Sequence, residues 1–215
     1  IISDTMKNII LELSFYKNKN DGNQCATITL QIATKYFLGK TPTLDEIDKL
    51  VGRATGKWTW NEQIIAGADK LGLKAKYFST DNIANILQGE KYLRQKFGKS
   101  ADKIISKINL NEVMDSTQFV IKNNLFEKKA LTLKEIENHI LKGHIVIVPV
   151  DWNKISGKKG IYQGHMLILT SFDEENIFAH NSGPTKPERN MKIKKELFLK
   201  AWNVPEISND IIIVY

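Results

Sequence analysis

The 215-residue chain contains only one cysteine, so it cannot form an internal disulfide. This absence is typical of proteins in a reducing compartment, and we expect a cytoplasmic location. The sequence also lacks an apolar run of roughly 18 residues, so no transmembrane helix is expected. It shows no signal-peptide pattern, but it begins at Ile1 rather than Met, which leaves secretion after signal removal open.

A concentrated block of positive charge is also missing. Lys and Arg total 31 against 24 for Asp and Glu, and the net charge of +7 comes mostly from lysines scattered among acidic residues. This distribution favours a solvated basic surface over a nucleic-acid site, which needs its charges on one face. No Cys, His and carboxylate cluster has metal-ligand spacing, and no glycine-rich loop could hold a phosphate. Neither a metal nor another cofactor is therefore expected.

The chain is long enough to bury a sizeable core, with 42% hydrophobic residues. We interpret residues 1–215 as a single domain in which residues 81–130 form a helical insertion. This segment is rich in lysine and interrupted by glycines, and its apolar residues recur at helical spacing. Two roles remain open for it: it caps a cleft and selects a substrate, or it adds a structural helical layer.

The single cysteine, Cys25, lies at the start of a strongly apolar helix predicted within residues 22–37. Gly22 and Asn23 offer a turn and a cap, which place Cys25 in the first helical turn. Free backbone N–H groups and the helix dipole favour a thiolate there. The alternative interpretation is a buried structural cysteine that packs as a small apolar residue.

Other helices and strands are predicted from helix-start signals, from alternating apolar residues and from continuous apolar runs. Capping boxes predict helix starts at Thr43 with Glu46, Thr59 with Glu62, and Thr132 with Glu135. Strands are predicted at residues 9–16, 73–77, 144–150, 164–171, 177–180, 191–194 and 211–215.

A four-residue turn at residues 173–176 joins two of these strands into a hairpin. His165 stands at the head of one strand and Asn181 just past the end of its antiparallel partner, so the two side chains are expected at one sheet edge. In thiol catalysis a histidine takes the cysteine proton, and an Asn or Asp side chain orients the imidazole. Cys25, His165 and Asn181 are therefore the predicted catalytic residues, with a packed strand-end histidine as the alternative for His165. His180 faces the opposite side of its strand from Asn181.

Further segments form an ordered pattern with the three predicted catalytic residues; they are residues 13–17, 70–73 and 141–143, Gly164 with His165, Phe172 with Asp173, and Trp202. In order and spacing the chain thereby resembles the C39-like peptidases, papain-like cysteine peptidases related to bacteriocin-processing peptidase domains. The resemblance covers nearly the whole chain except residues 81–130. The chain departs from the family where Ala26 and Thr27 follow the cysteine in place of Gly-Pro, and where His180 and Asn181 replace Asp-Pro. The resemblance implies an α+β papain-like fold, in which a helical half with the cysteine packs on an antiparallel sheet with the histidine.

The resemblance also implies a side-chain amide that stabilises the oxyanion. Family members carry a Gln about six residues before the cysteine, where this chain has Lys19. Asn18 aligns with that Gln after a one-residue loop insertion, whereas Gln24 has the right chemistry beside the nucleophile. Such a donor contributes about 3 kcal/mol to transition-state stabilisation.

Together these features predict a thiol-dependent acyl hydrolase, a cysteine peptidase that acts on a peptide or protein. Two alternatives remain. The same triad would serve an acyltransferase, and a catalytically inactive homologue would bind a peptide in the same cleft. The sequence does not predict the oligomeric state.

Overall fold

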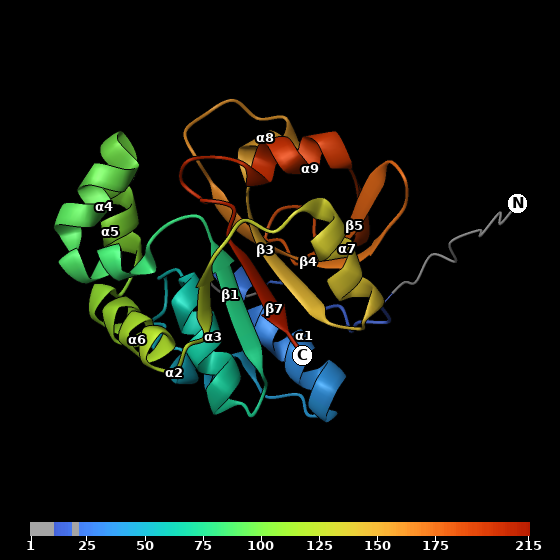
Figure 1. The fold of residues 1–215 in the computed structure, drawn as a ribbon, viewed down its shortest axis with the longest axis horizontal. Helices are drawn as coiled ribbons and strands as arrows, with labels where there is room; N and C mark the ends of the chain where they lie inside the picture. The colour runs from blue at the N-terminus through green and yellow to red at the C-terminus, as the bar shows by residue number, and fades with distance from the viewer. Residues whose placement is uncertain (1–10, 19–21) are drawn as a thin grey trace, which may run out of the picture.

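The computed structural model describes residues 11–18 and 22–215. Within these residues, seven strands form one mixed sheet in the order β2-β1-β7-β3-β4-β5-β6 (Figure 1). Only the β1–β2 pair is parallel. The strands are β1 (Ala75–Ser79), β2 (Phe126–Lys128), β3 (Ile145–Asp151), β4 (Gly164–Phe172), β5 (Asn176–Asn181), β6 (Glu188–Lys194) and β7 (Ile211–Val214).

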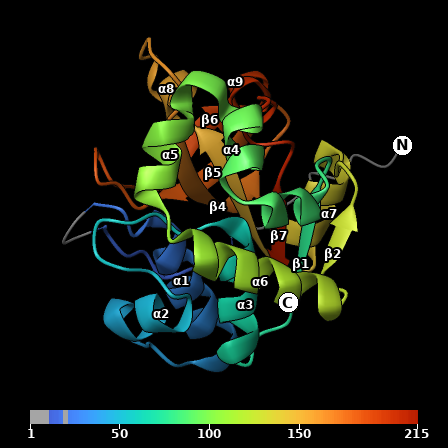
Figure 2. The same ribbon diagram turned by 90° about the vertical axis from the view of Figure 1, so that its left-hand side faces the viewer.

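Helices lie on both sides of this sheet, with α1 and α7 on opposite sides (Figure 2). The α-helices are α1 (Cys25–Leu38), α2 (Leu44–Leu50), α3 (Asn61–Lys70), α4 (Glu90–Phe97), α5 (Ala101–Lys107), α6 (Leu110–Lys122), α7 (Leu133–Leu141), α8 (Trp152–Ser156) and α9 (Lys195–Trp202). Two 3₁₀ helices are η1 (Ile83–Gln88) and η2 (Gly98–Ser100). None of the helices in the described part of the chain combines the length and the apolar character needed to cross a bilayer.

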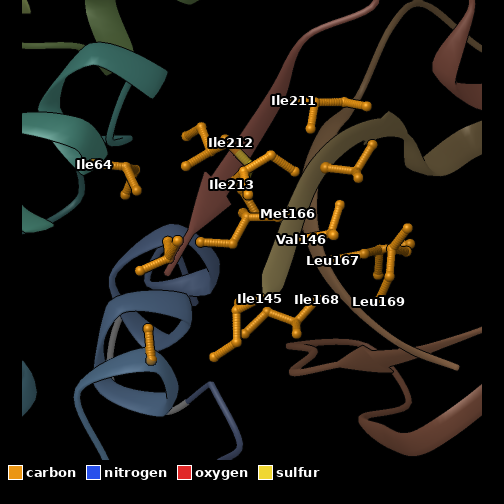
Figure 3. Close-up of a cluster of buried hydrophobic side chains, with 14 of the residues drawn as sticks. Ile64, Ile145, Val146, Met166, Leu167, Ile168, Leu169, Ile211, Ile212 and Ile213 are labelled. Atoms are coloured by element: carbon orange, nitrogen blue, oxygen red, sulfur yellow. The ribbon is translucent and has the colours of Figure 1, made fainter. Parts of the chain in front are cut away.

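The centre of the sheet is buried on both faces because β3 and β7 are apolar at every position but the last of β3. Their side chains and those of β4 pack against α1 and α3, as Figure 3 shows for Ile64, Met166 and Ile212. Each fully buried aliphatic side chain contributes about 1.5–3 kcal/mol relative to an exposed one. This core fixes the positions of β4 and of the helix that carries the cysteine.

Helix α1 is buried along most of its length, as its apolar pattern predicts. Three buried threonine hydroxyls on this helix are satisfied, because each donates to a backbone carbonyl one turn earlier. These residues are Thr27, Thr29 and Thr34. The helix ends at Gly39, which adopts a left-handed conformation with φ of 68° and donates its N–H to Lys35.

Two of the three predicted capping boxes form, at Thr43 and at Thr132. The prediction for Thr59 with Glu62 is wrong. The helix begins one residue later, and the Trp60 N–H donates to Gln63 Oε1 at 2.8 Å. Gln63 is held there by a second hydrogen bond from its Nε2 to the Val51 carbonyl. Glu62 is thereby free to turn into the protein interior, where it is 2% exposed.

The predicted strand at residues 9–16 is also wrong for its described part. Residues 9 and 10 lie outside the described residues, and no strand forms over residues 11–16. The Leu11 N–H reaches the Thr170 carbonyl at 2.9 Å, but the Leu13 N–H turns back onto the Leu11 carbonyl. This tight turn interrupts pairing after one bond.

Residues between β1 and β2 are mostly helical and build a second apolar cluster beside α3 (Figure 2). Its buried members are Ile86, Leu93, Phe97, Ala101, Ile104, Ile108 and Val113. Trp58 and Trp60 pack against this cluster, which joins the helical segment to the loop before α3.

Candidate active site

Cys25 is the first residue of α1, so its thiol lies beside backbone N–H groups that no helical carbonyl accepts. Burial raises the pKa of the Cys25 thiol above its ordinary value. The backbone N–H groups of Met166 and Ala26 hydrogen-bond to the thiol and oppose this rise, as does the positive charge of Arg53. The contact with Met166 brings β4 against the cysteine, and the residue that precedes Met166 in β4 is His165.

His165 is buried, and its Nε2 lies 2.9 Å from Asn181 Oδ1. The orientation of the Asn181 amide is fixed by two other bonds. Its Oδ1 accepts the Gly183 N–H at 3.0 Å, and its Nδ2 donates to the Lys186 carbonyl at 2.8 Å. Because the atom facing His165 is therefore an oxygen, His165 Nε2 must carry a proton and Nδ1 has the free lone pair.

Burial lowers the pKa of His165 to about 4, and the hydrogen bond with Asn181 acts in the opposite direction. The imidazole is therefore neutral at pH 7. The Trp152 ring lies 4.8 Å from the His165 ring, centroid to centroid, and shields it from water on one side. Trp152 is the first residue of α8, directly after β3, and nothing in its local sequence pattern indicates that it contacts His165.

Cys25 and His165 both line a cavity of about 380 Å³. Its walls come from the start of α1, the loop and first turn around residues 58–62, the helical segment at residues 81–104, the start of β4 and the chain before β7. Residues from the segment predicted as an insertion thus form part of a cleft that contains the cysteine. This volume lies within the range of protein pockets that bind a ligand.

The two predicted oxyanion residues, Gln24 and Asn18, do not line this cavity. Gln24 is buried and its Nε2 donates to Asp48 Oδ2 at 2.9 Å; Asp48 also pairs with Arg53. Asn18 Nδ2 donates to the Gly22 carbonyl at 2.9 Å, which closes the loop ahead of the cysteine. Both side-chain amides are therefore engaged in holding that loop, and an oxyanion role for either stays a prediction.

His180 has a different environment from its neighbour Asn181. The Asn190 N–H donates to its Nδ1 at 3.2 Å, so Nε2 carries the proton and contacts the Leu13 carbonyl at 3.3 Å. Both ring nitrogens are thus occupied by backbone groups, and His180 ties β5 to β6 and to the chain before α1. Among the described residues, no three His, Cys, Asp or Glu side chains come together in a way that could hold a metal ion.

Three solved structures share this fold over almost the entire chain. One, described as a C39-like peptidase from Bacillus anthracis, is 12% identical with a TM-score of 0.57, and the match covers 97% of this chain and 98% of that one. The second is the peptidase domain of Streptococcus ComA, a bifunctional ABC transporter involved in quorum sensing, at 14% identity and a TM-score of 0.51, with 95% and 97% covered.

The third is a double-glycine-motif protease from an AMS/PCAT transporter in complex with a leader peptide, at 11% identity and a TM-score of 0.51, with 98% of each chain covered. No protein-family model matches this chain, and neither does any curated protein. At these identities the likeness shows the fold alone. The predicted α+β papain-like fold of the C39-like peptidases is confirmed, whereas the activity has to be inferred from the residues of this chain.

Proposed function

We propose that the protein is a thiol-dependent acyl hydrolase of the cysteine peptidase type, with a peptide or protein as its substrate. The observation that carries this proposal is the fixed amide of Asn181. It selects the His165 tautomer with a proton on Nε2, which leaves Nδ1 as a base in the cavity that Cys25 also lines. His180 also has a fixed tautomer, but both of its ring nitrogens are occupied by backbone groups, whereas His165 Nδ1 keeps its lone pair.

In the proposed reaction, Cys25 Sγ attacks the substrate carbonyl while His165 Nδ1 takes the thiol proton. His165 then gives this proton to the leaving amine, and a thioester forms between Cys25 and the acyl group. Water, activated by the same nitrogen, hydrolyses the thioester and restores the thiol. Asn181 keeps the imidazole oriented through both proton transfers.

In this reaction we place the negatively charged oxygen that develops on the substrate at the start of α1, where the Cys25 N–H and the helix dipole favour negative charge. The sequence-based candidates for a second donor are Gln24 and Asn18. Neither side chain lines the cavity, so each would have to turn away from its present acceptor, Asp48 or the Gly22 carbonyl, to bring an N–H to the substrate oxygen.

The proposal is tested with a defined mixture of synthetic peptides, whose new N-termini are identified by mass spectrometry after incubation. We expect cleavage by the wild type and none by Cys25→Ala, together with a loss of about 100- to 10,000-fold in His165→Ala. His144→Ala is the matched control, because His144 contacts His139 and does not line the cavity. Equal cleavage by wild type and Cys25→Ala would refute the proposal.

The two alternatives give different results in the same assay. An acyltransferase would join the acyl group to added hydroxylamine or to an amine in preference to water. A peptide-binding homologue would show no cleavage, and its peptide affinity would survive in Cys25→Ala. The engaged amides of Gln24 and Asn18 are the observation that keeps this second alternative open.

A further inference from the structure

The cavity contains a second group of polar side chains, which the proposed reaction does not use. Glu62 comes from the first turn of α3, Asp210 immediately precedes β7, and Asp81 lies between β1 and η1. All three line the same cavity as Cys25. Three elements distant in sequence thus bring three carboxyl groups into one cleft.

Glu62 is 2% exposed, and its Oε2 has no hydrogen-bond partner among the described residues. Asp210 is 7% exposed, and its Oδ2 accepts a hydrogen bond from Asn61 Nδ2 at 2.7 Å. The same Asn61 nitrogen contacts the Tyr77 hydroxyl at 3.2 Å. A buried carboxylate oxygen without a donor is costly unless a ligand supplies one.

The cation closest to this group is already paired. Lys96 Nζ lies 2.6 Å from Asp81 Oδ2, and the Tyr92 hydroxyl donates to the same oxygen. Glu62 and Asp210 take part in no ion pair among the residues that the structure describes. The group therefore has three carboxyl groups and one lysine.

Burial raises the pKa of Glu62 to about 8 and that of Asp210 to about 7, and the two carboxyl groups lie close enough for the charge of Asp210 to raise the pKa of Glu62 further. Lys96 opposes both rises, and the hydroxyls of Ser79 and Tyr77 oppose that of Asp210. A second cation in the cleft would stabilise both carboxylates and displace their protons.

We propose that Glu62 and Asp210 form a subsite for a primary ammonium group of the substrate, that of a lysine side chain or of a chain N-terminus. This inference deepens the proposed function, because it names a group that the same cleft recognises. The same cavity is lined by Ile83, Ile86 and Phe97, which are apolar. They suit the methylene stem of a lysine, whose charged end would then reach Glu62 Oε2.

The subsite is tested on the Cys25→Ala protein, so that no catalysis is needed. Nα-acetyl-lysine methylamide and Nα-acetyl-norleucine methylamide differ by the ammonium group alone at the end of the side chain. We expect the lysine compound to bind at least about tenfold more tightly at pH 7, measured by calorimetry or NMR titration. We also expect its binding to release protons, seen as a heat that changes with the ionisation enthalpy of the buffer.

Three variants made in this background test the assignment. Glu62→Gln keeps the shape and removes the charge, and we expect it to abolish the lysine preference and reduce proton release. Asp210→Asn tests the same subsite if Glu62→Gln does not fold, and it should also reduce the lysine preference. Glu174→Gln removes the same charge from an exposed position outside the cavity and should leave the preference unchanged.

A third probe separates the two sources of the ammonium group. Norleucine methylamide with a free α-amine should bind more tightly than its acetylated form only if the subsite receives a chain N-terminus. Equal affinities for all three probes, no detectable binding, or a lysine preference that survives both Glu62→Gln and Asp210→Asn would overturn the subsite. None of these results bears on cleavage by Cys25, so the subsite and the proposed function fail independently.

Discussion

The buried carboxyl of Glu62 gives a stability prediction that does not depend on any substrate. Its pKa rises from the ordinary value of 4.5 to about 8, mainly through burial. Between these two values the folded protein keeps a proton that the unfolded chain releases, so stability falls as the pH rises from 4.5 to 8. The full rise corresponds to about 5 kcal/mol of unfolding free energy, a large share of the total for a domain.

Glu62→Gln removes this ionisation and nearly preserves the shape. We therefore expect the variant to gain stability relative to the wild type as the pH rises, by up to about 5 kcal/mol between pH 4.5 and pH 9.

The assay is urea unfolding of both proteins at pH 4.5, 7 and 9, followed by tryptophan fluorescence. Contributions from all other groups largely cancel, because only the difference between variant and wild type at each pH is used. A difference in unfolding free energy that does not change with pH would show that the pKa of Glu62 in the folded protein stays at its ordinary value. That result would refute its description as a buried carboxyl without a cation.

Three further substitutions give separate expectations. Asn181→Ala should lower kcat/KM by about 10- to 100-fold, less than His165→Ala, because the base remains but loses its orientation; steady-state cleavage rates measure this. Ile212→Ala should reduce the unfolding free energy by about 2–5 kcal/mol in urea, since Ile212 is fully buried in β7. Gln24→Ala should cost about 1–3 kcal/mol in the same assay, because Asp48 loses a buried donor. A Gln24→Ala protein of wild-type stability but greatly reduced kcat would instead assign Gln24 to the oxyanion.

The hairpin that carries His165 and Asn181 could be predicted from sequence because its determinants are local. A continuous apolar run defines the first strand, and the turn at residues 173–176 fixes which strand ends meet. The structure places the two side chains 2.9 Å apart. The bonds from Gly183 and to Lys186 that orient the amide could not be predicted, because they depend on the irregular backbone after β5.

The polar group around Glu62 was missed for a related reason. The local pattern favours a capping box of Thr59 with Glu62, whereas the structure forms only a hydrogen bond from the Trp60 N–H to Gln63, which no capping pattern in the sequence indicates. The choice depends on partners far along the chain, such as Asp210, which bonds to Asn61 across 149 positions. Similarly, β2 is a three-residue edge strand whose pairing with β1 has no alternating pattern long enough to detect.

The central claim, that Cys25 and His165 act as one unit, is tested most directly by the rate of Cys25 alkylation with iodoacetamide from pH 4 to pH 10. Burial lowers the pKa of His165 to about 4 and raises that of Cys25, so a thiolate–imidazolium pair forms only if the attraction between its two charges offsets this burial. We predict a rate that is constant from about pH 5 to about pH 8 in the wild type. In His165→Ala we predict a slow rate that rises about tenfold per pH unit, because only the free thiolate reacts. Identical profiles in the two proteins, both rising toward the thiol pKa, would contradict the claim.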